Sequence, residues 1–467
     1  MTATNVVNDG SGSGLDSYSH SPSKSRTNEP VIADHEVGLS EKPYRPTRWQ
    51  SNLTILSCYI ANFSDGIQNG LANPTNVIFK HLLATDPSGT GYPSTMQTRI
   101  SNSLIIGAIL GVVVLGYVSD MVSRRAGLLF TSGLVTIATL MAALALDVHP
   151  SYNMLWFMVV VRGVAGVGVG GEYPPSAAAG LEESDDFKRR YRGPVFVFFT
   201  TLMATTAAPI MQIIYLITLK ASDNNLPVTF HALYSIATIL PFMIMLLRFF
   251  MVDSTLYHNS NFKTTRQSRS FKFYLLLIRR YWPRLLSTSA AFFLYDFINF
   301  PNSIMSSTII ASLSSSRPSP VPGVILGAYL TNAIGRKYTG ILGFAGYVVT
   351  GFIIGGLFTP LSNHIAAFVV LYGLLNAFGH MGPGATIGLI STESFPTAIR
   401  GMGYSVALAF GRTGAAVGTH ATFYLAGSVA VLGIVVYWFL PESGELDLEK
   451  EDRELEAYLR ENGVVME

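Results

Sequence analysis

One apolar stretch of the chain carries two charged residues among closely spaced glycines. It runs from Leu155 to about Leu181 and contains Arg162, Glu172 and a glycine-rich sequence between them. A charge at membrane depth is costly and needs a partner or a watery cavity, whereas glycine lets a neighbouring helix approach closely. In a helix the two charged residues lie about 15 Å apart along the axis and about 80° apart around it, which excludes a local ion pair. The stretch therefore predicts either a transport path or a tightly packed helix with structural ion pairs to other helices.

The composition is that of a membrane protein. Of the 467 residues, 49% are hydrophobic and only 13% are charged, whereas soluble domains carry about 25% charged residues. The net charge of +2 gives no reason to expect a nucleic acid partner. The single cysteine, Cys58, excludes an internal disulfide framework and lies in an apolar run, which predicts a packing role.

The sequence shows no set of metal ligands, no nucleotide-binding loop and no catalytic triad. The glycine run before Glu172 is not a dinucleotide fingerprint, because no strand precedes it. We therefore expect no enzyme activity, no cofactor and no metal.

Apolar runs of membrane-spanning length recur along the chain. Residues 1–50 are rich in Ser, Asn, Asp and Gly and predict a disordered cytoplasmic tail, and residues 442–467 predict a second tail. Between them we expect an all-α membrane bundle of about twelve transmembrane helices in two six-helix halves. The halves cover residues 51–252 and 285–441, and a basic loop at 253–284 joins them. The expected spans are 53–79, a second ending at 116–125, 128–146, 155–181, 194–219, 230–251, one from 285, 321–334, 340–358, 365–390 and two within 401–440.

The basic clusters predict the orientation in the membrane. Taken as an even-numbered bundle, they all fall on one side, which by the positive-inside rule is the cytoplasm. Both termini are then cytoplasmic, in a multi-pass protein that we expect in the plasma membrane, and the basic loop contacts anionic lipid.

An internal repeat relates the two halves. The second span ends in Gly116, Asp120 and the pair Arg124-Arg125, and the eighth ends in the pair Arg336-Lys337. Two halves joined by a basic loop are typical of a secondary transporter with its site between the halves. We expect roles in gating and packing, mostly at the cytoplasmic face, for Gly116, Asp120, Arg124, Arg125, Arg162, Arg336, Lys337, Glu393 and Arg400.

Several motifs resemble those of a known family. The stretch 116–125, the glycine run after Arg162 and the stretch 393–401 resemble the signatures of the major facilitator superfamily. Within it, residues 168–174 are similar to the phosphate:proton symporter branch, which has an acidic residue before Tyr-Pro.

Three further stretches, 63–66, 295–310 and 382–390, are most similar to fungal glycerophosphoinositol permeases. The resemblance covers residues from about 50 to 445. It implies a proton-coupled carrier of small anionic organic phosphates, namely glycerophosphodiesters.

The resemblance also implies a site. Arginine offers a planar fork that suits a phosphodiester, and a buried carboxylate can load and release a proton. The implied substrate-binding residues are Tyr173, Phe292, Asp296, Phe300 and Arg412. The implied or candidate proton-coupling residues are Asp65, Glu172, Asp296 and His380.

The chain departs from the inorganic phosphate symporters at two aromatic positions. Phe292 stands where they have Trp and Phe300 where they have Tyr, so two polar phosphate contacts are lost and a bulkier organic phosphate is favoured. His380 stands where the diester permeases usually have an acidic residue. Each residue also has a structural interpretation: Asp65 as a hydrogen-bonding residue of span one, Asp296 as a partner of Arg412 that holds the halves together, and His380 as a packed polar residue.

Two regions are short for a working transporter. The apolar part of span eight is about fourteen residues, against about 20 for a membrane helix, and residues 401–440 must hold two helices. The C-terminal half is thus a candidate for shortening at 312–322 and 417–423. The alternatives to a diester symporter are a symporter of inorganic phosphate or another organic anion, a nutrient receptor with the same fold, and a shortened product that does not transport.

Overall fold

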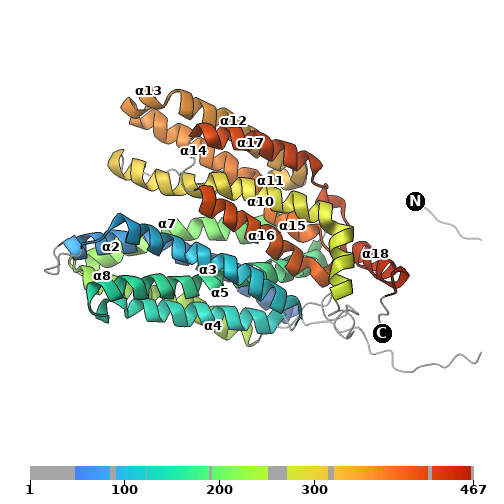
Figure 1. Cartoon of the computed structure of the whole chain (residues 1–467), viewed down its shortest axis with the longest axis horizontal. Helices are drawn as coiled ribbons and strands as arrows, with labels where there is room; N and C mark the ends of the chain where they lie inside the picture. The colour runs from blue at the N-terminus through green and yellow to red at the C-terminus, as the bar shows by residue number, and fades with distance from the viewer. Residues whose placement is uncertain are drawn as a thin grey trace, which may run out of the picture. The chain divides into compact units, whose positions relative to one another are not determined.

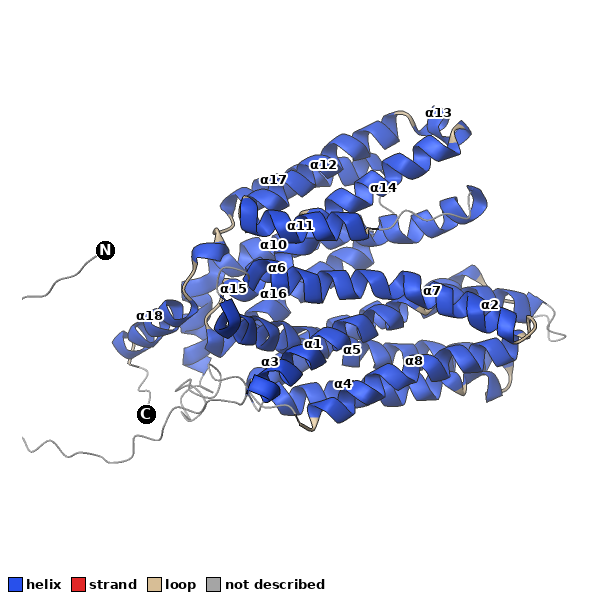
Figure 2. Cartoon of the chain, turned by 180° about the vertical axis from the view of Figure 1, so that it is seen from behind, coloured by secondary structure: helices blue, strands red, loops and turns tan. Residues whose placement is uncertain are grey.

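The computed structural model describes residues 48–84, 91–121, 124–188, 192–250, 271–313, 320–418 and 423–463, all within one compact unit, Pro43–Glu467. Within these ranges the chain is helical, without a strand (Figures 1 and 2). The helices of the N-terminal half are α1 (Arg48–Gly70), α2 (Ala72–Ala84), α3 (Ser94–Met121), α4 (Arg124–Ala143), η1 (Ala145–Asp147), α5 (Ser151–Lys188), α6 (Arg192–Val197), η3 (Phe198–Leu202), α7 (Met203–Ala221) and α8 (Leu226–Arg248).

The C-terminal half has the same kind of elements. They are α10 (Phe271–Leu313), α11 (Val321–Ala333), α12 (Arg336–Gly356), α13 (Phe358–Asn363), α14 (Ile365–Met381), α15 (Pro383–Glu393), η6 (Thr397–Ile399), α16 (Arg400–Val417) and α17 (Phe423–Phe439). After them come η8 (Ser443–Glu445) and α18 (Leu448–Glu461). Each of the twelve expected spans corresponds to one helix or to consecutive helices, which confirms an all-α membrane bundle.

Three spans are interrupted where the chain leaves regular α geometry. The first consists of α1 and α2, the fifth of α6, the π-turn η3 and α7, and the tenth of α14 and α15. In the tenth span the break falls at Gly382, whose φ and ψ are −91° and −100°. Interrupted helices are tolerated in membranes where neighbouring helices satisfy the backbone.

Glycines set the spacing of α3 and α5. A Cβ atom on Gly166 would lie 2.2 Å from the carbonyl oxygen of Leu104, and one on Gly170 would lie 2.1 Å from that of Ala108. The two backbones are therefore in contact, which confirms that the glycine run serves close helix packing. Along the same helix, Pro174 and Pro175 remain inside α5.

The two halves meet along several helices. Helix α16 packs against α3 and α5, α11 packs against α6 and η3, and α15 contacts α5 and α6. Figures 1 and 2 show the helices of the N-terminal half on one side and α11, α12, α14 and α17 on the other. The site described below lies on helices that face each other across this division.

Seven helices of the described residues are long and apolar enough to cross a membrane. The apolar helices α11 and α17 are shorter, at 13 and 17 residues, where about 20 span a bilayer. The short eighth span expected from the sequence is thus also short in the structure. Residues 314–319 and 419–422, inside the two regions expected to be shortened, lie outside the described residues.

The predicted basic loop and C-terminal tail both contain helix. Helix α10 begins at Phe271, well before the expected membrane entry near 285, and residues 251–270 lie outside the described residues. Helix α18 begins after Asp447, whose carboxylate accepts from the backbone N–H groups of Glu449 and Lys450. Buried Leu455 and Leu459 of α18 pack into a cluster with the start of α10.

Candidate functional site

An arginine and an aspartate lie close together in the C-terminal half. Arg412 of α16 and Asp296 of α10 are 3.8 Å apart, nitrogen to oxygen, and their side chains are 15% and 6% exposed. Helices α10 and α16 belong to the same half. The interpretation that this pair holds the two halves together is therefore wrong, although the pairing itself is present. A Cβ atom on Gly411 would lie 3.0 Å from the Asp296 carboxylate, so glycine leaves room for that carboxylate.

Arg412 also contacts the other half. Its guanidinium carbon lies 5.4 Å from the centre of the Tyr173 ring, in a cation–π contact with α5. Phe292 packs edge to face with Tyr404, with ring centres 5.8 Å apart. Of the predicted substrate-binding residues, Tyr173, Asp296 and Arg412 are thus brought together, with Phe292 beside Asp296 on α10. The side chain of Phe300 lies outside the described residues.

Asp65 of α1 is a buried carboxylate beside this group. It is 1% exposed, and its Oδ2 atom has no hydrogen-bond partner among the described residues. It interacts electrostatically with Glu172, Arg248 and Arg412. A carboxylate buried without a hydrogen bond at one oxygen is costly unless it is protonated or a ligand supplies a donor. Its role in proton coupling stays a prediction.

Glu172 forms a buried ion pair within the N-terminal half. Its carboxylate accepts from Arg248 of α8, which is 0% exposed and also donates to the carbonyl oxygen of Leu128 at 2.7 Å. In this conformation Glu172 thus makes the structural ion pair to another helix that the sequence left open. The sequence analysis did not identify Arg248 as the counter-charge of Glu172. An arginine within the apolar run 230–251 is nevertheless itself a signal of a buried acidic partner.

We expect Arg248→Leu to lower the apparent thermal stability of the detergent-solubilised protein strongly. Removing one partner of a buried ion pair leaves an uncompensated charge and costs about 3–5 kcal/mol. The double variant Glu172→Leu, Arg248→Leu removes both charges and should recover most of the loss. A double variant no more stable than Arg248→Leu would show that packing, not charge, is what Arg248 contributes.

Arg162 and His380 each bond to a backbone carbonyl oxygen outside this group of charges. Arg162 is 3% exposed and donates through Nε to the carbonyl oxygen of Ile100 on α3, at 3.1 Å. His380 bonds through Nδ1 to the carbonyl oxygen of Asn376 in its own helix, at 2.9 Å. The gating role of Arg162 and the proton-coupling role of His380 stay predictions.

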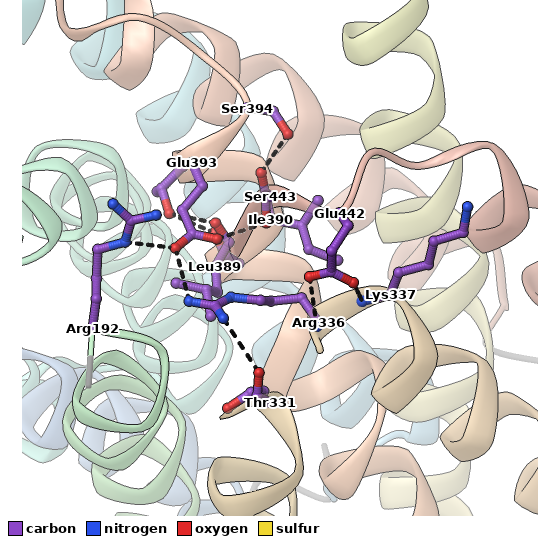
Figure 3. Close-up of polar contacts among 12 residues, drawn as sticks. Arg192, Thr331, Arg336, Lys337, Leu389, Ile390, Glu393, Ser394, Glu442 and Ser443 are labelled. Carbon is purple, nitrogen blue, oxygen red and sulfur yellow. Dashed lines mark hydrogen bonds and ion pairs between the residues drawn. The ribbon is translucent and has the colours of Figure 1, made fainter. Parts of the chain in front are cut away.

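Cross-half ion pairs gather at one end of the bundle. Glu393 of α15 accepts from Arg192 of α6 at 2.8 Å and from Arg336 of α12 at 3.4 Å (Figure 3). Its second oxygen accepts from the Ser443 hydroxyl at 2.6 Å. Because Arg192 belongs to the N-terminal half, this cluster joins the two halves.

A second ion pair crosses between the halves at this end. Arg400 of α16 donates to Glu182 of α5 at 2.6 Å, and neither side chain is exposed. We call this end of the bundle, with Glu182, Arg192, Glu393 and Arg400, the ion-pair end. The structure thus brings the predicted Arg336, Glu393 and Arg400 together, and it adds Glu182 and Arg192, which sequence reasoning missed.

Glu442 caps the start of α12 at the same end. Its carboxylate accepts from the backbone N–H groups of Arg336 and Lys337, at 2.9 and 3.1 Å (Figure 3). Gly335 precedes them with φ of +90°, a conformation that favours glycine. The Lys337 ammonium lies over the Trp438 ring, 5.4 Å from its centre. Lys337 therefore packs within the C-terminal half and makes no ion pair among the described residues.

The remaining predicted gating residues lie near the end of α3. A Cβ atom on Gly116 would lie 1.8 Å from the Ser405 hydroxyl, so α3 and α16 touch here. Arg125 donates to the carbonyl oxygen of Phe249. The side chains of Asp120 and Arg124 lie outside the described residues.

Helix α18 is bound to the ion-pair end. Arg284 of α10 makes two bonds to Glu451, at 2.9 and 3.0 Å. Asp452 accepts from the N–H and the hydroxyl of Thr397, at 2.7 and 2.6 Å. Burial raises the pKa of Asp452, and nearby Arg400 opposes that shift. The C-terminal helix thus contacts the segment that leads into α16.

Comparison with known proteins identifies the class. The model of the "Sugar (and other) transporter" family matches residues 53–275 and 319–455, which is most of the chain. The chain therefore belongs to this family of major facilitator transporters. It is an integral, multi-pass membrane protein and not an enzyme.

Individual relatives agree with this membership. The chain is 72% identical to the MFS-type transporter lnaF of Aspergillus flavus, over 91% of this chain and 90% of the relative. It is 32% identical to glycerophosphoinositol transporter 1 of Saccharomyces cerevisiae, over 89% of this chain and 84% of the relative. The solved proton:xylose symporter XylE superposes with a TM-score of 0.68 at 18% identity, over 88% of this chain and 99% of that chain, which shows the fold alone.

Proposed function

We propose that this chain imports glycerophosphodiesters together with protons by alternating access. The observation that carries the proposal is the position of Arg412, which lies near Asp296 of its own half and over Tyr173 of the other half. A cation that contacts both halves can bind an anion between them and respond when the halves move. The relatedness to a glycerophosphoinositol transporter supports this class of substrate.

The charges around Arg412 support proton coupling. Asp65, Glu172 and Asp296 contribute three carboxylates, while Arg248 and Arg412 contribute two guanidinium groups. With all five ionised, this group already carries one net negative charge. A further anion is costly to admit to so buried a site unless a proton enters with it. Glu172 and Asp296 make ion pairs, whereas Asp65 makes none among the described residues and has one oxygen without a hydrogen bond, so we propose that Asp65 takes up this proton.

The same charges favour a phosphodiester over inorganic phosphate. A diester keeps a single negative charge as the pH rises, whereas inorganic phosphate has a second acidic proton to lose and becomes partly doubly charged near neutral pH. Arg248 is fully buried and engaged by Glu172 and Leu128, which leaves Arg412 as the cation of this group placed between the halves. A single arginine beside an aspartate suits the single negative charge of a diester better than the larger charge of inorganic phosphate.

We further propose that the ion-pair end faces the cytoplasm. Among the described basic residues, Arg192, Arg284, Arg336 and Arg400 have their contacts at this end, which supports a cytoplasmic position by the positive-inside rule. Both termini are then cytoplasmic, and the protein lies in the plasma membrane. The conformation described here is closed towards the cytoplasm by the pairs Arg192–Glu393 and Arg400–Glu182.

Uptake measurements test this function. Cells that lack their own carriers should take up labelled glycerophosphoinositol or glycerophosphocholine faster at acidic than at neutral pH when they express this chain. Asp65→Asn should reduce both the rate and its dependence on pH, because the proposed proton acceptor is lost. Surface labelling of the unmodified protein and of Asp65→Asn is the necessary control.

Other outcomes separate the alternatives. Inorganic phosphate that competes better than either diester would replace the substrate assignment. Ligand-dependent signalling without uptake, from protein shown to be at the surface, would favour a nutrient receptor. Neither uptake nor signalling from surface protein would favour a shortened chain that does not transport.

A further inference from the structure

A groove lies on the outer face of the N-terminal half, between α3 and α5. Its volume is about 560 Å³. Ile106 and Leu110 of α3 and Val160 of α5 line it and are more than half exposed. Glu172, which belongs to the charged site, is instead buried in the N-terminal half. In a membrane protein an exposed apolar face of this kind contacts the acyl chains of lipids.

Gly163 keeps the groove open. A Cβ atom on Gly107 would lie 2.0 Å from the carbonyl oxygen of Gly163, so the two backbones touch along the floor. A Cβ atom on Gly163 itself would meet only the carbonyl oxygen of Ser103, at 3.8 Å, which is an ordinary contact. A side chain at position 163 therefore has room, and the space is available to another molecule.

One end of the groove carries a positive charge. Arg99 is exposed, and its guanidinium carbon lies 5.0 Å from the centre of the Trp156 ring. Within the described part of the chain it makes no ion pair, and its hydrogen bond goes to the Met96 sulfur at 3.9 Å. Asn102 lines the groove one turn further along α3. An arginine beside a tryptophan is typical of the boundary between lipid headgroups and acyl chains.

The dimensions of the groove match one leaflet of a bilayer. Arg99 and Leu110 both line it and lie about 16 Å apart along α3, at 1.5 Å per residue. The hydrocarbon core of a bilayer is about 30 Å thick, so this distance is about half of it. With Arg99 at the headgroup boundary, the apolar part of the groove extends to the middle of the membrane.

We propose that this groove binds one acyl chain of a glycerophospholipid, with the lipid phosphate at Arg99. The charge of the phosphate complements the guanidinium, which lacks an acidic partner in the described residues. The apolar walls exclude water, because a water molecule needs polar partners. A sterol would fill the apolar part but would leave the cation unpaired. This site is separate from the proposed transport site, and its ligand is a membrane lipid, not the transported substrate.

Photo-cross-linking of the full-length protein tests the proposal. The protein is placed in phosphatidylcholine vesicles that contain a phospholipid with a photoreactive acyl chain, and labelled peptides are mapped by mass spectrometry. We expect label concentrated in 98–110 and 156–167. Gly163→Leu should lower this labelling at least fivefold by filling the groove, and Gly163→Val provides a smaller filling variant if the leucine variant folds poorly. Arg99→Gln should weaken phospholipid labelling while leaving a photoreactive sterol unaffected.

A matched control is available on α4. A Cβ atom on Gly133 would meet only the Met245 sulfur, at 3.6 Å, so Gly133→Leu adds the same side chain away from the groove. In Gly133→Leu, phospholipid labelling of the groove should equal that of the unmodified protein. The proposal would be overturned if the label were spread evenly over exposed helices and were unchanged in both Gly163→Leu and Gly163→Val. Ordinary boundary lipid is expected to give that result. Displacement of the phospholipid by the sterol, or protein–protein cross-links through the groove, would also overturn the proposal.

Discussion

Replacing Arg412 by glutamine is expected to lower diester uptake by about 100-fold. Loss of a buried, hydrogen-bonded charge from a binding site costs about 2–5 kcal/mol, and each 1.4 kcal/mol is a factor of ten. In this chain the loss is compounded because Asp296 is left nearly buried without its partner. Arg412→Lys keeps the charge but loses the planar fork, so we expect an intermediate rate. The measurement is initial uptake of labelled glycerophosphoinositol, divided by the amount of protein at the cell surface.

A double variant separates binding from folding in this test. Arg412→Gln alone leaves an uncompensated carboxylate and is expected to reduce the amount of folded protein. Asp296→Asn together with Arg412→Gln removes both charges and should restore folding and surface expression, but not uptake. Restored uptake in the double variant would show that Arg412 neutralises Asp296 and does not bind the anion.

The number and order of the membrane spans could be predicted from the sequence because they depend on local chemistry. A run of apolar residues long enough to cross a bilayer forms a helix wherever it lies in the chain, since its backbone must be satisfied internally. The breaks within spans are harder to place. The tenth span is divided at Gly382, where Gly-Pro-Gly marks a turn that the apolar pattern alone does not show.

The candidate site could be predicted only in part. The resemblance to a family assigned three residues to one site, namely Tyr173, Asp296 and Arg412. A family pattern carries this information because it reflects which residues are neighbours in the folded protein. Asp296 and Arg412 lie in the C-terminal half, where their spans had been placed, so their pairing does not join the halves, and it is Tyr173 that provides the contact across them. Periodicity along one helix places a side chain on a face but does not identify what faces it.

The partners of the buried charges were missed for the same reason. Arg248 lies 76 positions from Glu172 in the sequence, and Arg192 lies 201 positions from Glu393. No local pattern links residues so far apart. What the sequence does show is that each buried charge needs a counter-charge, and a search for unassigned arginines near apolar runs would have nominated both.

Glu393→Gln is expected to open the ion-pair end. Glu393 holds Arg192 across the halves and Arg336 within its own half, and none of these side chains is more than 8% exposed. Breaking a buried ion pair costs about 3–5 kcal/mol. Because the pair exists only in the closed conformation, the substitution destabilises that conformation relative to the open one. The population of that conformation relative to one with the halves apart should then fall by roughly 100-fold or more.

A cysteine placed inside the closed end reports this opening. Ser405 is 3% exposed and lies against Gly116 where α3 meets α16, about 7.5 Å along the helix from Arg400. In a Cys58→Ser background, Ser405→Cys should react with a maleimide at least ten times faster when Glu393→Gln is also present. Glu442→Gln is the matched control, because among the described residues Glu442 bonds only backbone N–H groups of the C-terminal half, so this substitution should leave the rate unchanged. If the combination of Glu393→Gln and Arg400→Gln also leaves the rate at the control level, apolar packing between α3 and α16, rather than the ion pairs, holds this end closed.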